Sequence, residues 1–195
     1  MNPVKLVLGF VPFLLVSVLA GRLSFAWAAG IGLVAALVLA ITTAQGGVKL
    51  LPASQVAILG VLTILGVVGS AGIKDWLDDY GRSTASIALG SVVIVTAFIA
   101  PFTLQYAREA APPAVWNTHG FLALNRQISL AWGLAVLAVG ISHIAATEMD
   151  KHGDSRLLEI LFSWGIPVAA LIAALLYTKQ VSARARHAGP GGTTA

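Results

Sequence analysis

Residues 25–41 contain no charged or strongly polar side chain. A hydrophobic run of this length is typical of a helix that crosses a lipid bilayer, because a helix satisfies its own backbone polar groups where water is absent. The rest of the 195-residue chain has the same character, since 57% of it is hydrophobic and 10% is charged. Soluble domains carry about a quarter charged residues. The sequence therefore predicts an all-α integral membrane protein and excludes an ordinary soluble domain.

Six apolar segments of suitable length for membrane-spanning helices follow one another along the chain. We expect the spans at residues 4–21, 24–44, 53–72, 83–105, 127–147 and 157–179. Residues 1–181 then form one six-helix transmembrane bundle, and residues 182–195, which lack apolar content, form a disordered basic cytoplasmic tail.

Two of these segments allow a second interpretation. The third is rich in glycine, which lowers helix propensity, so a tilted, bent or partly re-entrant span is the alternative there. The first resembles a secretory signal peptide with a small-residue cleavage site at residues 18–20. The short connection to the second segment favours a tight helical hairpin instead.

The charged residues between the spans predict the orientation. With a cytoplasmic amino terminus, seven of the twelve Lys and Arg residues fall inside and five outside. Cytoplasmic connections are enriched in Lys and Arg. Glu109 is the only one of the eight acidic residues on the inside. We therefore expect a multi-pass membrane protein with both termini in the cytoplasm.

Short internal matches raise the question of a repeat. Residues 22–27 and 127–132 share Ser, Ala and Trp, and the dipeptide Pro-Phe occurs at residues 12–13 and 101–102. The matched segments would run in opposite directions, as in transporters built from two three-helix inverted repeats. Chance similarity between Ala- and Leu-rich helices is the alternative interpretation.

The longest inside connection, residues 106–126, contains two prolines followed by Trp116. The prolines stop the fourth helix, and an interfacial helix that starts at them would place Trp116 among the lipid headgroups. An irregular loop with one aromatic anchor is the alternative.

Groups that carry catalysis are scarce. The chain has no cysteine, which excludes thiolate nucleophiles, disulfides and iron–sulfur clusters. The apolar segments contain no carboxylate pair, HExxH sequence, phosphate-binding loop or GxSxG turn. We therefore expect no enzymatic activity, no cofactor and no metal. Nucleic acid is not expected as a partner either, because the basic residues form no stripe.

Four polar side chains are the candidates for a functional site. They are His143, Ser142, Gln55 and His119. A histidine within an apolar segment can relay protons, sense pH or ligate haem. His143 lies near the outer end of the fifth segment, so an interfacial histidine bonded to water or to a backbone carbonyl is the preferred interpretation. His119 belongs to the inside connection and lies at the wrong depth to pair with it.

Residues 74–82 set three carboxylates beside Trp76 and Tyr80 on the outside. Three acids could hold calcium or magnesium, but the spacing lacks the alternation of a calcium-binding loop. A solvated turn whose aromatic side chains lie at the membrane interface is the preferred interpretation.

Small residues recur at helical spacing on the second and third segments. The predicted packing positions are Ala28, Gly32, Ala36, Ala40, Gly66 and Gly69. Such faces let two helices approach closely. Packing within the chain is the preferred interpretation, and a homo-oligomer interface or a sliding surface in a carrier is the alternative.

The order of several short features resembles one family of bacterial membrane proteins. These features are residues 9–12 (Gly-Phe-Val-Pro), 40–42 (Ala-Ile-Thr), 77–79 (Leu-Asp-Asp), 101 with 104–106, and 131–132 (Ala-Trp). Over residues 8–146 the chain resembles the intracellular septation protein A family. The resemblance implies a role in envelope synthesis and septation through protein partners and supplies no catalytic residues. The sixth span and the basic tail go beyond shorter members, and the basic stretch after the aspartates is reduced to Arg82.

Two functions are predicted at this stage. The first is a non-enzymatic inner-membrane protein that supports cell-envelope maintenance or septation, with membrane-protein partners, the lipid bilayer and a second copy of itself as contacts. The alternative is a small transporter or channel-like protein for an uncharged or lipophilic substrate. A polar cavity at the midplane would favour transport, whereas a solid bundle would favour the scaffold.

Overall fold

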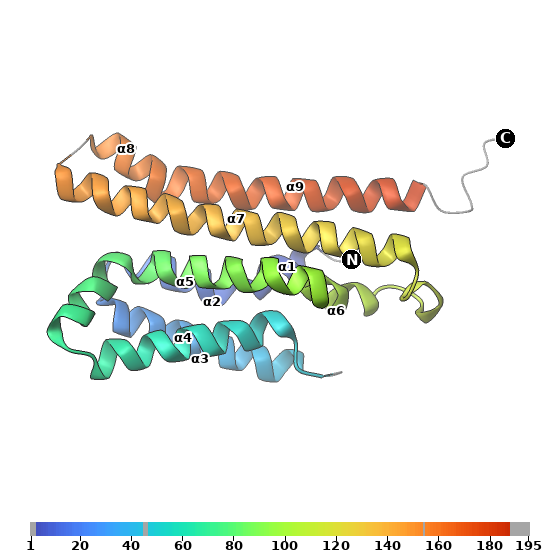
Figure 1. The fold of residues 1–195 in the computed structure, drawn as a ribbon, viewed down its shortest axis with the longest axis horizontal. Helices are drawn as coiled ribbons and strands as arrows, with labels where there is room; N and C mark the ends of the chain where they lie inside the picture. Colours follow the sequence, from blue (N-terminus) through green and yellow to red (C-terminus); the bar gives the residue numbers. More distant parts are fainter. Residues whose placement is uncertain (1–2, 45–46, 154, 188–195) are drawn as a thin grey trace.

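The computed structural model describes residues 3–44, 47–153 and 155–187, and within these ranges the chain forms helices and no strand (Figure 1). The helices are α1 (Pro3–Gly9), α2 (Val11–Leu19), α3 (Phe25–Thr43), α4 (Leu50–Val68), α5 (Ala71–Ile99), α6 (Phe102–Arg108), α7 (His119–His152), α8 (Arg156–Ile160) and α9 (Ile166–His187). A single 3₁₀ turn, Pro113–Val115, precedes α7, and a π-helical turn, Leu161–Gly165, joins α8 to α9. The predicted all-α architecture is confirmed.

Five helical segments are long and apolar enough to cross a membrane. They are Phe25–Thr43, Leu50–Val68, Ala71–Ile99, His119–His152 and Arg156–Ala185. The first apolar segment breaks at Phe10 into α1 and α2, which are each too short to span a bilayer. Pro12 lies in the first turn of α2, where its missing N–H favours a new helix start over a continuous helix.

The long helices run antiparallel, so the bundle has two ends (Figure 1). The α8 end, on the left of Figure 1, holds the connections α2–α3, α4–α5 and α7–α8. The α6 end, on the right, holds the connections α3–α4 and α6–α7, and α9 also ends there. Helix α1 contacts α6 and α9, so the first apolar segment starts towards the α6 end and finishes at the α8 end.

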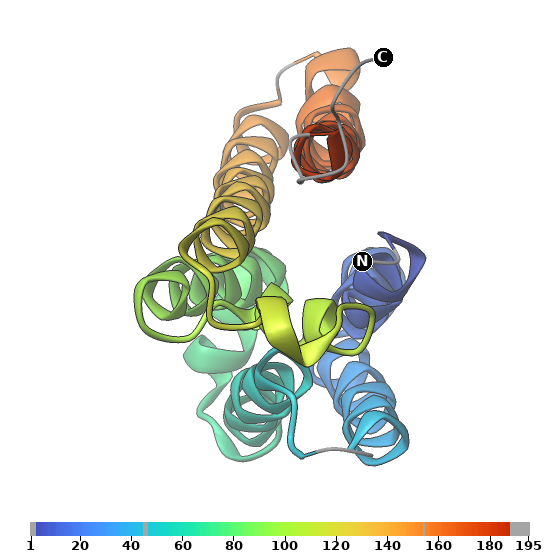
Figure 2. The same ribbon diagram turned by 90° about the vertical axis from the view of Figure 1, so that its right-hand side faces the viewer.

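The helices form a layered bundle in cross-section (Figure 2). Helix α5 packs mainly on α7, α3 packs mainly on α4, and α9 lies at the edge of the bundle against α7. Among the five candidate spans α7 is the most buried and α9 the least. Helix α7 is therefore the central element on which both sides of the bundle are assembled.

An aromatic cluster fills the core between α1–α2, α6 and α7. It consists of Phe10, Phe102 and Trp132. Phe10 stacks on Trp132 with ring centroids 4.9 Å apart and meets Phe102 edge-on at 6.1 Å. All three side chains are buried. Large aromatic rings in offset or edge-on contact stabilise a core beyond their buried area.

Several helix ends differ from the expected spans. Residues 74–82 belong to the first turns of α5 and do not form a separate turn. Pro112 and Pro113 begin only a 3₁₀ turn and not the expected interfacial helix. Trp116 Nε1, which follows this turn, donates to the Ala111 carbonyl at 2.9 Å. Helix α9 continues to His187, so residues 182–187 of the expected disordered tail are helical. Residues 188–195 lie outside the described residues.

Candidate functional site

A cavity of about 370 Å³ opens at the α8 end, between the end of α2, α5, α7 and the α8–α9 turn. Its charged lining residues are Asp78, Asp79, Arg82, Asp150 and Glu159. Thr147, Ser163 and Trp164 also line it. We call this cavity the charged pocket.

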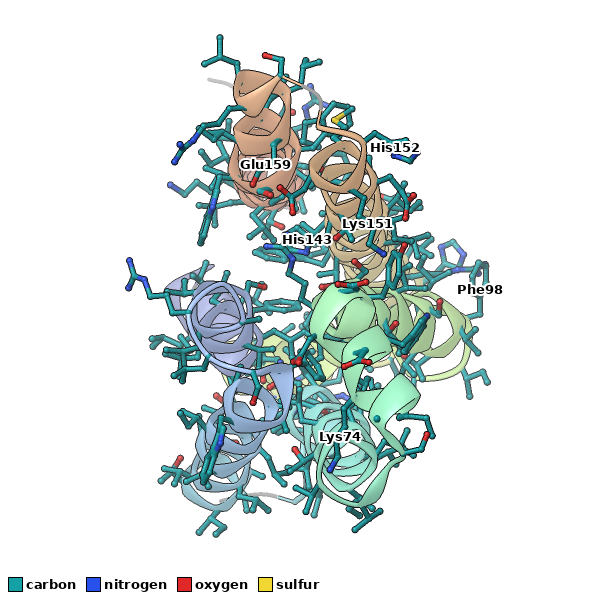
Figure 3. The ribbon with its side chains drawn as sticks, turned by 90° about the vertical axis from the view of Figure 1, so that its left-hand side faces the viewer. Lys74, Phe98, His143, Lys151, His152 and Glu159 are labelled. Atoms are coloured by element: carbon teal, nitrogen blue, oxygen red, sulfur yellow. The ribbon has the colours of Figure 1, made fainter. Side chains whose placement is uncertain are left out.

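Helical spacing brings these side chains together. Asp78 and Arg82 lie one turn apart on α5, and Thr147 and Asp150 are three residues apart on α7, so each pair shares a face. The extensive contact between α5 and α7 then places the two faces side by side. Glu159 arrives from α8, on the face turned towards α7 (Figure 3).

Arg82 is under-bonded for a partly buried guanidinium. Its Nη2 donates to Ser163 Oγ at 3.5 Å, and this is its only hydrogen bond within the described part of the chain. No described carboxylate lies within 4.0 Å of it, although the charge of Glu159 acts on it. An arginine side chain carries five N–H donors in a planar fork. Most of these donors therefore have no acceptor among the described residues.

Two of the four carboxylates are occupied by other parts of the fold. Asp78 Oδ1 accepts a hydrogen bond from the backbone N–H of Phe25 at 2.6 Å, at the start of α3. Asp79 Oδ2 pairs with Lys151 Nζ at 2.7 Å. Lys151 also donates to Tyr80 Oη at 2.9 Å. These contacts hold α3 and α7 onto the first turns of α5.

The other two carboxylates, of Asp150 and Glu159, have no hydrogen bond or ion pair to any described residue. Asp150 is exposed and Glu159 is half-buried. Asp78 bonds Phe25 and Asp79 pairs with Lys151. The pocket therefore presents the Arg82 guanidinium and the two remaining carboxylates to a ligand. It is therefore a site of mixed charge with unsatisfied donors and acceptors.

The π-helical turn shapes the wall of the pocket. Pro167 has no N–H, so the carbonyl of Ser163, four residues earlier, cannot form its usual helical bond. The imidazole of His143 on α7 lies beside the Ser163 backbone. Ser142 Oγ donates to the neighbouring Phe162 carbonyl at 2.5 Å. Extra turns of this kind are frequent at functional sites.

His143 is buried behind the pocket. Its side chain is 2% exposed and points into the region between α7, α2 and α8–α9 (Figure 3). The ring lies beside the Ser163 backbone, and it is buried, whereas an interfacial histidine would be exposed to water. Its Nδ1 has no hydrogen-bond partner in the described structure. His143 and Ser142 thus share one site, next to Arg82.

Gln55 and His119 lie elsewhere. Gln55 is fully buried, and its Nε2 donates to the Gly9 carbonyl at 2.8 Å. That carbonyl lies at the α1–α2 break, where the N–H of Phe13 bonds Phe10 instead of Gly9. Gln55 therefore has a structural role in bracing the break. His119 is the exposed first residue of α7 at the α6 end.

The small-residue face of α3 packs within the chain. Ala28, Gly32 and Ala36 are buried, and Ala40 is half-buried. A Cβ at Gly32 would lie 2.3 Å from Val16 Cγ2 on α2 and 3.3 Å from Leu59 Cδ1 on α4. These distances leave no room for a side chain.

The two predicted packing glycines of α4 have different roles. A Cβ at Gly66 would lie 2.8 Å from Ala26 Cβ on α3, so this glycine is a helix contact. A Cβ at Gly69 would lie 2.8 Å from Ile73 Cγ2 in the first turn of α5, so this glycine belongs to the tight α4–α5 connection. It ends α4 with extended backbone and donates its N–H to the Leu65 carbonyl.

The most extensive helix contact lies between α5 and α7, and it contains close approaches at glycines that sequence reasoning missed. A Cβ at Gly90 would lie 2.8 Å from the Leu137 backbone nitrogen and 3.0 Å from the Gly133 carbonyl oxygen. A Cβ at Gly140 would lie 2.9 Å from the Ile87 backbone nitrogen. The seven-residue spacing of Gly133 and Gly140 on one helix is the signal that could have found this interface.

A second cavity, of about 480 Å³, lies at the α6 end between the α6–α7 connection, the start of α7 and the end of α9. Its lining is mainly apolar, with Phe121, Leu124 and Ile128 among its residues. Nearby, Lys49 Nζ pairs with Glu109 Oε1 at 2.5 Å. Burial, assisted by the charge of Glu109, raises the pKa of Tyr106 to about 12, so this phenol is protonated at neutral pH.

Several polar side chains near the aromatic cluster bond other parts of the chain. Thr103 Oγ1 donates to the Asn125 carbonyl at 2.8 Å and lies 2.9 Å from Ser129 Oγ. Trp132 Nε1 donates to Thr178 Oγ1 on α9 at 3.0 Å. These groups join α6, α7 and α9 and were not among the predicted site residues. Their signal in the sequence was weak, because single Ser and Thr residues are common in apolar helices.

Among residues 3–44, 47–153 and 155–187, no group of three or more His, Asp or Glu side chains has the arrangement of a metal site. The charged pocket is therefore the candidate binding site of the described structure. In comparisons with known proteins, no family model, curated protein or solved structure matches this chain.

Proposed function

We propose that this chain is a non-enzymatic inner-membrane protein that supports cell-envelope maintenance or septation through protein partners. The observation that supports this proposal best is the packed middle of the bundle. There Phe10 stacks on Trp132, and Phe102 contacts Phe10 edge-on. The polar groups at the same depth, such as Thr103 and Thr178, are bonded to other parts of the chain. A scaffold needs a solid core of this kind, whereas a carrier needs a path.

We further propose that the chain crosses the membrane six times, with α1 and α2 together as a broken first crossing and both termini in the cytoplasm. The support is the antiparallel run of the helices (Figure 1) together with the excess of Lys and Arg on the termini side. Reporter fusions after Pro113, Ala145 and the carboxyl end test this arrangement. A carboxyl end outside the cytoplasm would contradict it.

The outer face of α3 is the proposed partner surface. Trp27, Val34 and Ile41 are 72%, 61% and 75% exposed there, while the opposite face of the same helix is buried against α2 and α4. In a bilayer this face meets lipid or another membrane helix. A partner helix that packs on α3 would bury all three side chains.

Site-specific photocrosslinking in living bacteria tests the scaffold proposal. A photoreactive residue at Val34 is expected to capture specific division or envelope-synthesis proteins, and the same residue at buried Leu59 is the control. A fluorescent fusion at the carboxyl end is expected to concentrate at the septum. Crosslinks to lipid alone, with uniform fluorescence around the cell, would contradict the proposal.

A small transporter for a lipophilic substrate is the second candidate. It is favoured by the two cavities, which lie at opposite ends of the bundle on either side of the aromatic cluster. Substrate passage would require Phe10 and Trp132 to separate. Transfer of a fluorescent lipid analogue across liposomes containing the purified protein tests this function. If the wild-type protein transfers the lipid analogue and the Trp132→Ala variant transfers it faster, the transporter proposal replaces the scaffold proposal.

A further inference from the structure

Among the described residues, the guanidinium of the charged pocket has one hydrogen bond, and two of the pocket's carboxylates have none. We propose that this pocket binds a phosphoethanolamine group, with Arg82 on the phosphate and Asp150 and Glu159 on the ammonium. This chemistry occurs in the headgroup of a membrane phospholipid and in soluble phosphoethanolamine esters. The inference does not depend on the protein partners proposed above, because those contact the outer face of α3.

Arg82 supplies the phosphate contact. Its guanidinium is partly buried and, within the described ranges, makes one hydrogen bond, of 3.5 Å, to Ser163 Oγ. Planar arginine donors match phosphate oxygens in pairs, and hydrogen bonds between charged groups are about twice as strong as neutral ones. Ser163, which is 7% exposed, holds the side chain from the π-helical turn without using its other donors.

The free carboxylates supply the ammonium contact. Asp78 is committed to the start of α3 and Asp79 to Lys151, which leaves Asp150 and Glu159. A primary ammonium has three N–H donors and can bond both. A simple anion would be repelled by these carboxylates, and a simple cation would be repelled by Arg82. A zwitterion with a phosphate and an ammonium satisfies both halves of the pocket.

The surroundings of the pocket favour a lipid as the source. The pocket lies where the apolar helices end at the α8 end, between the end of α2 and the α8–α9 turn. Trp164 and Ile160 line it and are 47% and 49% exposed. Tryptophan is enriched at the depth of lipid headgroups. The cavity of about 370 Å³ is in the size range of small-ligand sites.

Lipid titration of the purified full chain in detergent tests the proposal. Native mass spectrometry measures the apparent Kd of phosphatidylethanolamine, phosphatidylcholine and phosphatidylglycerol with matched acyl chains. We expect phosphatidylethanolamine to bind at least 10-fold more tightly than the other two. Phosphatidylcholine lacks N–H donors for the carboxylates, and phosphatidylglycerol lacks the ammonium. Equal binding of all three lipids, or preference for phosphatidylglycerol, would overturn the proposal.

Variants assign the two halves of the headgroup. Arg82→Gln is expected to weaken phosphatidylethanolamine binding at least about 10-fold, because it removes the charged donors that bond the phosphate. Glu159→Gln is expected to weaken phosphatidylethanolamine while strengthening phosphatidylglycerol, so the ratio of the two affinities reverses. Lys74→Gln and Asp75→Asn are the matched controls, because both residues are exposed on α5 at the same end and neither lines the pocket.

Two further measurements complete the test. Arg82→Lys keeps the positive charge but lacks the planar group of donors. It replaces Arg82→Gln in the test if that variant fails to fold. We expect it to bind phosphatidylethanolamine with intermediate affinity. Soluble glycerophosphoethanolamine, added to lipid-free protein, separates the two sources of the group. Thermal stabilisation by the soluble compound at the lipid's concentration would assign the pocket to a free ester of the same chemistry. Unchanged affinity ratios in both Arg82→Lys and Glu159→Gln would overturn the assignment of these residues.

Discussion

The indole ring of Trp132 on α7 stacks on the phenyl ring of Phe10, with ring planes 10° apart. Phe10 is the residue at which the first apolar segment breaks, so the stack attaches that break to the central helix of the bundle. Trp132 also donates a hydrogen bond to Thr178 on α9. One side chain thereby joins the first, fifth and last apolar segments of the chain.

Replacement of Trp132 with alanine is expected to lower the free energy of unfolding by about 3–5 kcal/mol. The variant loses the stack on Phe10, leaves a cavity and leaves Thr178 without its donor. Chemical denaturation of the protein in detergent measures the change. Trp27→Ala is the control, because Trp27 is 72% exposed and its loss is expected to change the stability by less than about 0.5 kcal/mol.

Gly32→Leu is expected to destabilise the fold by about 1–3 kcal/mol or more, because even a Cβ would overlap Val16 and approach the Pro12 carbonyl oxygen at 3.2 Å. Val38→Leu adds bulk to the same helix at a position that is 55% exposed, and little change is expected. Melting temperatures in detergent separate the two variants. Equal melting temperatures would mean that the small-residue face of α3 does not pack within the chain.

Much of the architecture could be predicted from hydrophobic length alone. Helix α3 occupies Phe25–Thr43 because its apolar run is uninterrupted, and residues 24–44 were expected there. The burial of Gly32 and Ala36 could also be predicted, because small residues at four-residue spacing make one smooth face. These features depend on local sequence, which is why pattern reasoning reached them.

The break at Phe10 and the charged pocket could not be predicted. Gly9 and Pro12 do not by themselves end a helix within a membrane, and the break persists because Gln55 bonds the freed Gly9 carbonyl and Trp132 stacks on Phe10. The pocket assembles Arg82, Asp150 and Glu159 from three helices. Their proximity depends on how α5 and α8 pack on α7, which no local pattern encodes.

Gly90→Ala tests the close contact of α5 with α7. Alanine is normally preferred over glycine inside a helix by about 1 kcal/mol, but here the added methyl would lie 2.8 Å from the Leu137 backbone nitrogen. We therefore expect a loss of stability of at least about 1 kcal/mol. Gly120→Ala, in the first turn of α7 with nothing within 4 Å of the new Cβ, is expected to be neutral or stabilising. A gain of stability in both variants would contradict the contact.

His143→Ala is expected to lower the free energy of unfolding by about 2 kcal/mol or more, because the ring is 2% exposed and its loss leaves a cavity. An interfacial histidine bonded to water would tolerate the change. His119→Ala removes an exposed ring from the same helix and is the control, with an expected change below about 0.5 kcal/mol. Thermal unfolding of the two variants without added lipid makes the comparison.

Asp78 stabilises the start of α3 from another helix. Ser24 occupies the position before α3 but makes no capping hydrogen bond with its side chain, and the N–H of Phe25 donates to Asp78 Oδ1 at 2.6 Å instead. A carboxylate at this place satisfies a free N–H and lies at the positive end of the helix dipole. Asp78→Ala is therefore expected to cost about 0.5–2 kcal/mol, and Asp78→Asn, which keeps the acceptor without the charge, is expected to cost less. Hydrogen exchange should be faster at Phe25 in the alanine variant than in Asp75→Ala, and equal exchange rates would mean that the carboxylate does not cap α3.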